Sequence, residues 1–187
     1  MIEIKNFPKK IYIFLSFLLF FSGFFGGYFW TQKNVLKVLK YLLKLQEILS
    51  PVLNLSPFFQ FLFVFFNNSI NSFLVIFLGS IFCIFPAIVL LVNGGILGSL
   101  FFLFKLKLET KSFFLLILPH GIFEVPAILL SGAAGLSLGV STFKRIFRKQ
   151  RGLKKEFKKS FSFFFKTLIP LWIVAAFVEI FFTPLLK

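Results

Sequence analysis

The sequence predicts an all-α polytopic membrane protein with about five transmembrane helices. Hydrophobic residues make up 58% of the 187 residues, and the mean hydropathy is +0.96, well above the usage of soluble domains. The apolar residues form unbroken runs, which indicates helices that are apolar all round. Lysines flank these runs, as they do at membrane borders. The whole chain, 1–187, is therefore expected to form a single integral membrane domain.

The first span is predicted at 11–30, where about 20 apolar residues are enough to cross the bilayer. Tyr28 and Trp30 at its far end suit the membrane interface. A basic start followed by an apolar run resembles a signal peptide. The large Phe residues and the missing small-residue cleavage site favour a retained signal anchor instead.

Residues 33–49 predict an amphipathic helix that lies on the membrane surface. Its lysines share one face, and leucines and valines occupy the positions between them. The lysines are Lys33, Lys37, Lys40 and Lys44. A helix packed against other parts of the protein is the alternative. Pro51 is expected to end this helix.

The remaining apolar runs predict four more spans. The run 57–66 is too short to cross the bilayer and is interpreted as a short interfacial or re-entrant helix, followed by the polar stretch 67–72. Asn93-Gly94-Gly95 indicates a tight turn. The four spans are expected at 73–92, 95–107, 112–140 and 161–186, with a basic loop at 141–160 between the last two.

The distribution of Lys and Arg predicts the orientation in the cell membrane. A cytoplasmic N-terminus and an outside C-terminus put 12 of the 21 basic residues inside and 8 outside, with Lys166 in the last span. The segment 144–159 would then contact anionic lipid headgroups, each charge contributing on the order of 1 kcal/mol near the surface. The net charge of +15 can also indicate nucleic-acid binding, but no nucleic-acid-binding fold accompanies it, so nucleic acid is not expected.

One polar cluster lies inside an apolar stretch, LPHGIFEVPA at 118–127. The single histidine, His120, and Glu124 are spaced i, i+4, so they share a helix face. Pro119 and Gly121 are expected to break or kink the fourth span near 119–121. Broken helices that end at a central site recur in transporters.

We interpret His120 and Glu124 as an intramembrane polar site, with Asn93 and Glu179 as further members, because ionisable residues within a bilayer favour function. The alternative is a structural break whose histidine satisfies freed carbonyls, or a location at the interface. One His and one Glu are too few to bind a metal. A single cysteine, Cys83, cannot form a cysteine cluster, so no metal or cofactor is expected.

Small residues recur at a spacing that permits close helix contact. Two GxxxG pairs and one further glycine are candidates for helix packing: Gly94, Gly98, Gly132, Gly135 and Gly139. Packing within the chain is favoured over dimerisation, and a homo-oligomer stays open as the alternative.

The pattern NNSINSF…LG…LLVNGGILGSL…LPHGIFEVPAILLSGAAGLSLG resembles the stage II sporulation protein M family. The resemblance covers about 58–139 and the five-span layout. Its most specific parts are Asn93-Gly94 and Pro119-His120-Gly121 with Glu124. In spore formers it implies a membrane scaffold that recruits a cell-wall hydrolase for peptidoglycan remodelling without being the hydrolase. Because family members also occur where no spores form, the implication kept here is a scaffold or assembly subunit that organises membrane partner proteins.

The catalytic inventory favours a protein without enzymatic activity. The chain has no Asp, one His and no nucleophile-elbow pattern. The main alternative is a permease or channel-like subunit for a small solute, ion or lipid, using His120 and Glu124. An intramembrane enzyme with these two residues as base and acid is a weaker alternative.

Overall fold

The computed structural model describes residues 7–81, 83–107, 109–149 and 152–186. Within this part of the chain there is no strand, and five helices are long and apolar enough to cross a membrane, which confirms the predicted all-α polytopic class. Four are α1 (Lys10–Lys33), α3 (Pro57–Leu78), α4 (Ile84–Leu106) and α5 (Thr110–Phe147). The fifth is composite: α6 (Leu153–Phe163), η1 (Phe164–Leu168), α7 (Ile169–Phe177), η2 (Val178–Phe182) and η3 (Thr183–Leu186).

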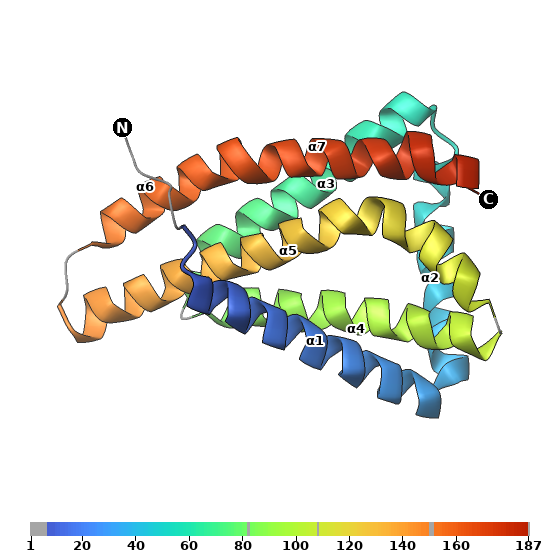
Figure 1. Cartoon of the computed structure of the whole chain (residues 1–187), viewed down its shortest axis with the longest axis horizontal. Helices are drawn as coiled ribbons and strands as arrows, with labels where there is room; N and C mark the ends of the chain where they lie inside the picture. The colour runs from blue at the N-terminus through green and yellow to red at the C-terminus, as the bar shows by residue number, and fades with distance from the viewer. Residues whose placement is uncertain (1–6, 82, 108, 150–151, 187) are drawn as a thin grey trace.

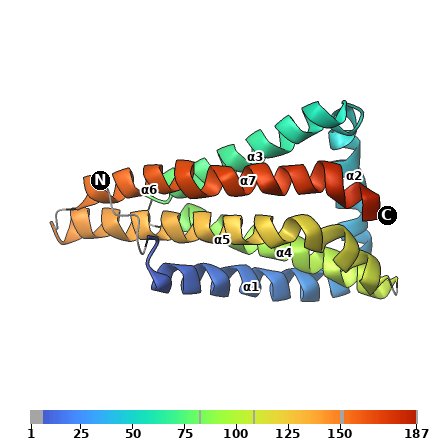
Figure 2. The same cartoon turned by 45° about the horizontal axis from the view of Figure 1, so that its top comes forward.

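The amphipathic helix α2 (Val35–Leu53) runs across one end of the bundle (Figure 1, Figure 2). Val38 on its apolar side is buried, whereas Lys37 and Lys40 are exposed. The helix does not end at Pro51 as predicted but continues to Leu53. Proline lacks the N–H that would bond Glu47, and the Ser50 hydroxyl donates to that carbonyl instead (2.8 Å).

The second and third spans differ from the prediction. α3 is one 22-residue helix that includes both 57–66 and the polar stretch 67–72. The predicted short interfacial or re-entrant helix at 57–66 and the predicted span at 73–92 are therefore both wrong. Polar residues stay within this span because other helices receive their side chains, as described below. The chain turns at 79–83 instead, where Cys83 has a φ of 67°.

The predicted turn at Asn93-Gly94-Gly95 is also wrong, and so is the short span at 95–107. α4 passes straight through these residues from Ile84. Asn93 donates its side-chain amide to the Val89 carbonyl one turn earlier (2.8 Å), so it remains within the helix instead of capping a turn.

Pro119 and Gly121 do not break the fourth span. α5 is continuous over 38 residues, and its first half is bent (Figure 1). A proline removes a single backbone hydrogen bond, which the packed neighbouring helices tolerate as a bend. The expected break near 119–121 is therefore replaced by a kinked helix.

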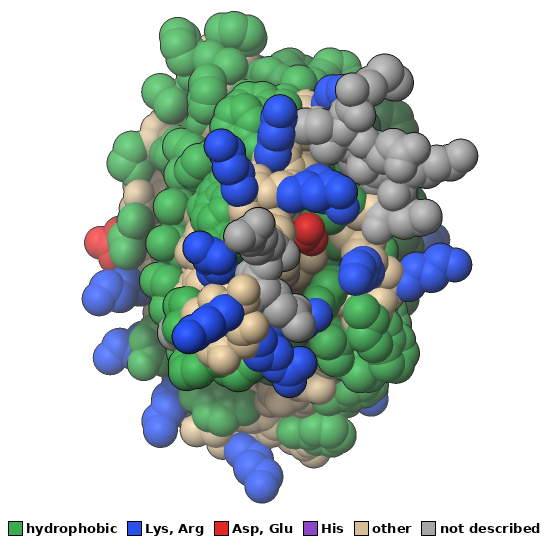
Figure 3. Space-filling model, turned by 90° about the vertical axis from the view of Figure 1, so that its left-hand side faces the viewer, with side chains coloured by type: hydrophobic (Ala, Val, Ile, Leu, Met, Phe, Trp, Pro, Cys, Tyr) green, Lys and Arg blue, Asp and Glu red, His purple; other side chains and the backbone are tan. Residues whose placement is uncertain are grey.

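The basic segment 141–160 is mostly helix rather than loop. α5 continues to Phe147 and α6 begins at Leu153, so the last span starts earlier than the predicted 161. Lys and Arg are good helix formers and point into solvent, and Ser137 of α5 donates to Glu156 of α6 (2.7 Å). Figure 3 views this end of the molecule, where lysines and arginines gather. Lys5, Gln150 and Arg151 lie outside the described residues.

α5 is the central helix of the bundle and contacts α1, α3, α4, α6 and α7. Half of its spanning window is buried, against 17–28% for the other spans. The continuous buried run is 131–139, whose small residues let neighbouring backbones approach closely.

Glycines lie at each close contact between these helices. A Cβ on any of four glycines at the α1–α4 contact would overlap a carbonyl of the opposite helix. The pairs are Gly23 with Leu91, Gly27 with Gly95, Gly94 with Phe20, and Gly98 with Phe24. On α5, Gly135 and Gly139 approach α3 and the 79–83 turn, and Gly132 faces the Leu90 side chain. The five predicted packing glycines thus lie at contacts within the chain.

The glycine contacts predict a sharp difference between two adjacent positions. Gly27→Ala would push its methyl group into the Gly95 carbonyl, so we expect a loss of about 1–3 kcal/mol in the free energy of unfolding. Gly26→Ala is the matched control, because nothing lies within 4 Å of its Cβ, and it should be neutral or stabilising by up to about 1 kcal/mol. Reversible unfolding in mixed micelles measures both, and equal effects would contradict this packing.

Candidate functional site

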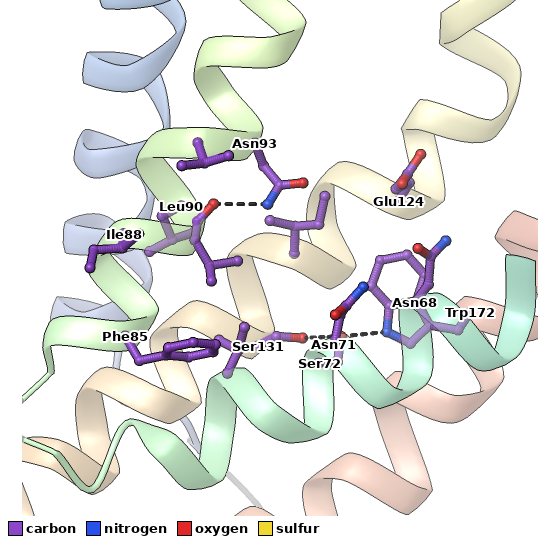
Figure 4. A pocket seen from close by; sticks show the side chains of 14 residues that line it. Asn68, Asn71, Ser72, Phe85, Ile88, Leu90, Asn93, Glu124, Ser131 and Trp172 are labelled. Carbon is purple, nitrogen blue, oxygen red and sulfur yellow. Dashed lines mark hydrogen bonds between the residues drawn. The ribbon is translucent and has the colours of Figure 1, made fainter. Parts of the chain in front are cut away.

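A cavity of about 370 Å³ lies between α3, α4, α5 and α7 (Figure 4). Aliphatic and aromatic side chains form much of its wall. Its polar lining consists of Asn68, Asn71, Ser72, Asn93, Glu124, Ser131 and Trp172. This combination of an apolar wall with a few convergent polar groups is typical of binding sites.

The cavity lies near the middle of the spanning helices. Asn68 and Asn71 are close to the midpoint of α3, and Asn93 is close to the midpoint of α4. Gly94, next to Asn93, packs on Phe20 near the midpoint of α1. The polar groups are therefore at a depth where hydrocarbon, not water, surrounds a spanning helix.

A buried hydrogen-bond network forms the floor of the cavity. The Trp172 indole N–H donates to Ser72 Oγ (2.8 Å), and Ser131 Oγ lies 2.9 Å from the same oxygen. Ser131 also donates to the Ala127 carbonyl on its own helix (2.6 Å). All three side chains are almost completely buried. The network joins α3, α5 and α7 and fixes the position of the indole ring.

The asparagines keep hydrogen-bonding capacity free. Asn93 uses its NH₂ group on Val89, which leaves its amide oxygen unbonded beside the cavity. Asn71 has no hydrogen-bond partner among the described residues. Figure 4 shows the side chains of Asn68, Asn71 and Asn93 turned toward the space between their helices. Burying an amide without a hydrogen-bond partner in an apolar medium costs about 2–7 kcal/mol of free energy, so a bound group that hydrogen-bonds to these amides would be stabilising.

Glu124 brings a carboxylate to the cavity. Its Oε2 lies 3.8 Å from His120 Nε2, so the two residues share a face as predicted, at a distance longer than a hydrogen bond. His120 does not line the cavity, and its Nδ1 is buried without a partner in the described part of the chain. Glu179 of η2 does not line the cavity.

Of the four residues predicted for the polar site, Asn93 and Glu124 line the cavity and His120 lies beside Glu124, whereas Glu179 is not among the lining residues; Pro119 and Gly121 flank the histidine in α5. In the residues described, no three His, Cys, Asp or Glu side chains group as metal ligands. The predicted site did not include five lining residues, of which Asn68 and Asn71 were interpreted as helix caps rather than as residues that line a polar entry: Asn68, Asn71, Ser72, Ser131 and Trp172. The i, i+3, i+4 spacing of the first three is the signal that could have found them, had 67–72 been read as helix.

The cavity opens sideways between α3 and α4. Ile88 and Val92 line it and are each 52% exposed, and Asn71 is exposed as well. α3 and α4 diverge from the 79–83 turn, and α2 crosses the other end of the bundle (Figure 2). This mouth lies at the depth of the bilayer interior.

The network at the cavity floor predicts the effect of removing one hydroxyl. Ser72→Ala removes the acceptor of Trp172 and the contact with Ser131, so we expect a loss of about 1–2 kcal/mol in the free energy of unfolding. Ser22→Ala on the exposed side of α1 is the matched control and should change stability by less than about 0.5 kcal/mol. Equilibrium unfolding in mixed micelles, followed by tryptophan fluorescence, measures both. Equal stabilities would contradict the network.

Comparisons with known proteins place the chain in a family. An uncharacterised protein of Methanocaldococcus jannaschii is 32% identical over 179 residues, which cover 94% of this chain and 95% of that protein. A second uncharacterised protein of the same organism is 34% identical over 113 residues, or 58% of this chain and half of that protein. No solved structure matches significantly. The family described as Stage II sporulation protein M matches residues 16–184, and the chain therefore belongs to this family.

Proposed function

We propose that this chain is a non-enzymatic assembly subunit that holds a partner protein inside the membrane. The observation that supports it best is the mouth between α3 and α4, where amide groups face the bilayer interior beside exposed Ile88 and Val92. Lipid tails offer no hydrogen bonds to such groups. A transmembrane helix of another protein could cover the apolar rim and satisfy the amides at the same time.

Two further features support an assembly role. The family resemblance implies a scaffold that organises partners. The basic end formed by α5 and α6 would face the cytoplasm in the orientation predicted from charge. There it would hold anionic lipid headgroups and set the depth of the bundle in the cell membrane.

Site-specific photocrosslinking tests the proposed function. A photoreactive phenylalanine analogue at Ile88, on the rim of the mouth, should form covalent protein adducts in native membranes. The same analogue at Phe14 is the control, because Phe14 is 57% exposed on α1, which does not border the cavity. An adduct of twice the mass of the chain would identify the partner as a second copy. Adducts at neither position, or equally at both, would contradict the proposal.

A permease or channel-like subunit is the second candidate function. It is favoured by Glu124 in the cavity and by two π-helical turns, η1 and η2, in the last span. π-Helical turns inside helices often occur at functional sites, and Glu179 lies on the second of them. A small solute or ion would bind these groups on its way across the bilayer.

Transport in proteoliposomes tests this second candidate. Glu124→Gln and His120→Ala should abolish flux of the transported ion or solute, because each removes one polar group of the proposed pathway. The helical circular dichroism should stay unchanged, because neither substitution removes a helix. Glu109→Gln, before the start of α5 and outside the cavity, is the matched control and should retain full flux. Equal flux in all variants, or none in the native protein for protons, metal ions and small amines, would rule this candidate out.

A further inference from the structure

The one acidic residue that lines the cavity, Glu124, lacks a basic partner among the residues that the structure describes. The ion-pair contact recorded for Glu124 is the 3.8 Å approach to His120 on its own helix, and no Lys or Arg lies within 4 Å of either Glu124 or Glu179 in the residues described. A carboxylate kept in an apolar environment is very costly unless it is paired and hydrogen-bonded. The bundle thus holds a carboxyl group at mid-membrane, beside the cavity, that no described Lys or Arg side chain pairs with.

The basic residues of the spans do not supply the missing charge. Lys166 is exposed on η1, thirteen residues before Glu179, which is about 20 Å of helix. Lys105, at the end of α4 beyond the cavity, donates to the Tyr28 hydroxyl (3.0 Å). Neither lysine pairs with Glu124 in the described structure, so a basic partner for this carboxyl group would come from another molecule.

From the charge, depth and opening of the cavity, we infer that its occupant is the basic side chain of a partner transmembrane helix, a Lys or Arg near the midpoint of that helix. This inference rests on the proposed assembly function and names the chemistry of the partner. The mouth opens toward the bilayer, so a helix that already spans the membrane reaches it by lateral diffusion.

The cavity matches a long basic side chain in both shape and chemistry. The stem of a lysine or arginine would lie along Leu90 and Ile128 of the apolar wall, and its charged head would reach Glu124. A lysine ammonium has three N–H donors. The Glu124 carboxylate and the free oxygens of Asn93 and Asn71 supply three acceptors around the same space. The apolar rim at Ile88 and Val92 would pack against the partner's backbone and neighbouring side chains.

Binding of a designed transmembrane peptide to the full-length protein in lipid nanodiscs tests this inference. The probe is a fluorescent Leu/Ala helix with one central Lys, and the matched peptides carry Leu or Glu at that position. We expect the Lys peptide to bind at least about tenfold more tightly than the Leu peptide. Glu124→Gln, which keeps shape and removes charge, should reduce that preference to about threefold or less.

Two controls make the result specific. Glu47→Gln, on the surface helix α2 away from the cavity, should leave the Lys preference unchanged. Asn93→Leu, which removes one acceptor oxygen, should weaken the Lys peptide but not the Leu peptide. Unfolding in mixed micelles confirms that each variant is folded before its affinity is compared.

Several outcomes would overturn the inference. Equal binding of the Lys and Leu peptides would do so, and so would a Lys preference that survives Glu124→Gln. Glu124-dependent binding of n-butylammonium without binding of the peptide would indicate a small-cation site instead. If crosslinking at the Ile88 position still gives a partner, failure of the peptide test rejects only the basic side chain. If crosslinking fails as well, the assembly function itself is rejected.

Discussion

Close backbone contact at glycines is the constraint on which this bundle depends. Lipid tails are as apolar as leucine side chains, so helices in a bilayer gain little from hiding apolar surface and associate through packing and hydrogen bonds. The four interlocking glycines of α1 and α4 and the 131–139 run of α5 provide that packing. Large phenylalanines, by contrast, cover much of the outside, where shape matters less.

The same contacts explain why a cavity exists. Gly94 and Gly98 hold α4 against α1. Gly135 holds α3 against α5, close to the turn that joins α3 to α4. Two helices that are adjacent in sequence are thus drawn to different partners. They separate as they leave the 79–83 turn, and the space between them cannot collapse without breaking a glycine contact. Asn68, Asn71 and Ser72 face into this space, which is why they can remain in the middle of a spanning helix.

Sequence reasoning predicted the class, the number of spans, the amphipathic helix and the i, i+4 relation of His120 and Glu124, because hydropathy and helical periodicity are local properties. It misplaced the second and third spans because Asn and Ser in 67–72, and Gly in Asn93-Gly94-Gly95, have the same local signature in a turn and in a tightly packed helix. Their role depends on which helix lies opposite. Ser131 and Trp172 reach the site through contacts separated by 59 and 100 residues from Ser72, which no local pattern contains.

Assembly and transport make different demands on one acidic cavity. A carrier must let the occupant leave on either side of the membrane, which requires a path along the bundle and a charge that exchanges readily. An assembly site must retain its occupant, and a mouth that opens sideways suits a ligand that stays in the bilayer. The buried network of Ser72, Ser131 and Trp172 ties three helices together at the floor of the cavity, where a carrier would need them to move apart. That rigidity, together with the lateral opening, is the physical reason for favouring assembly over transport.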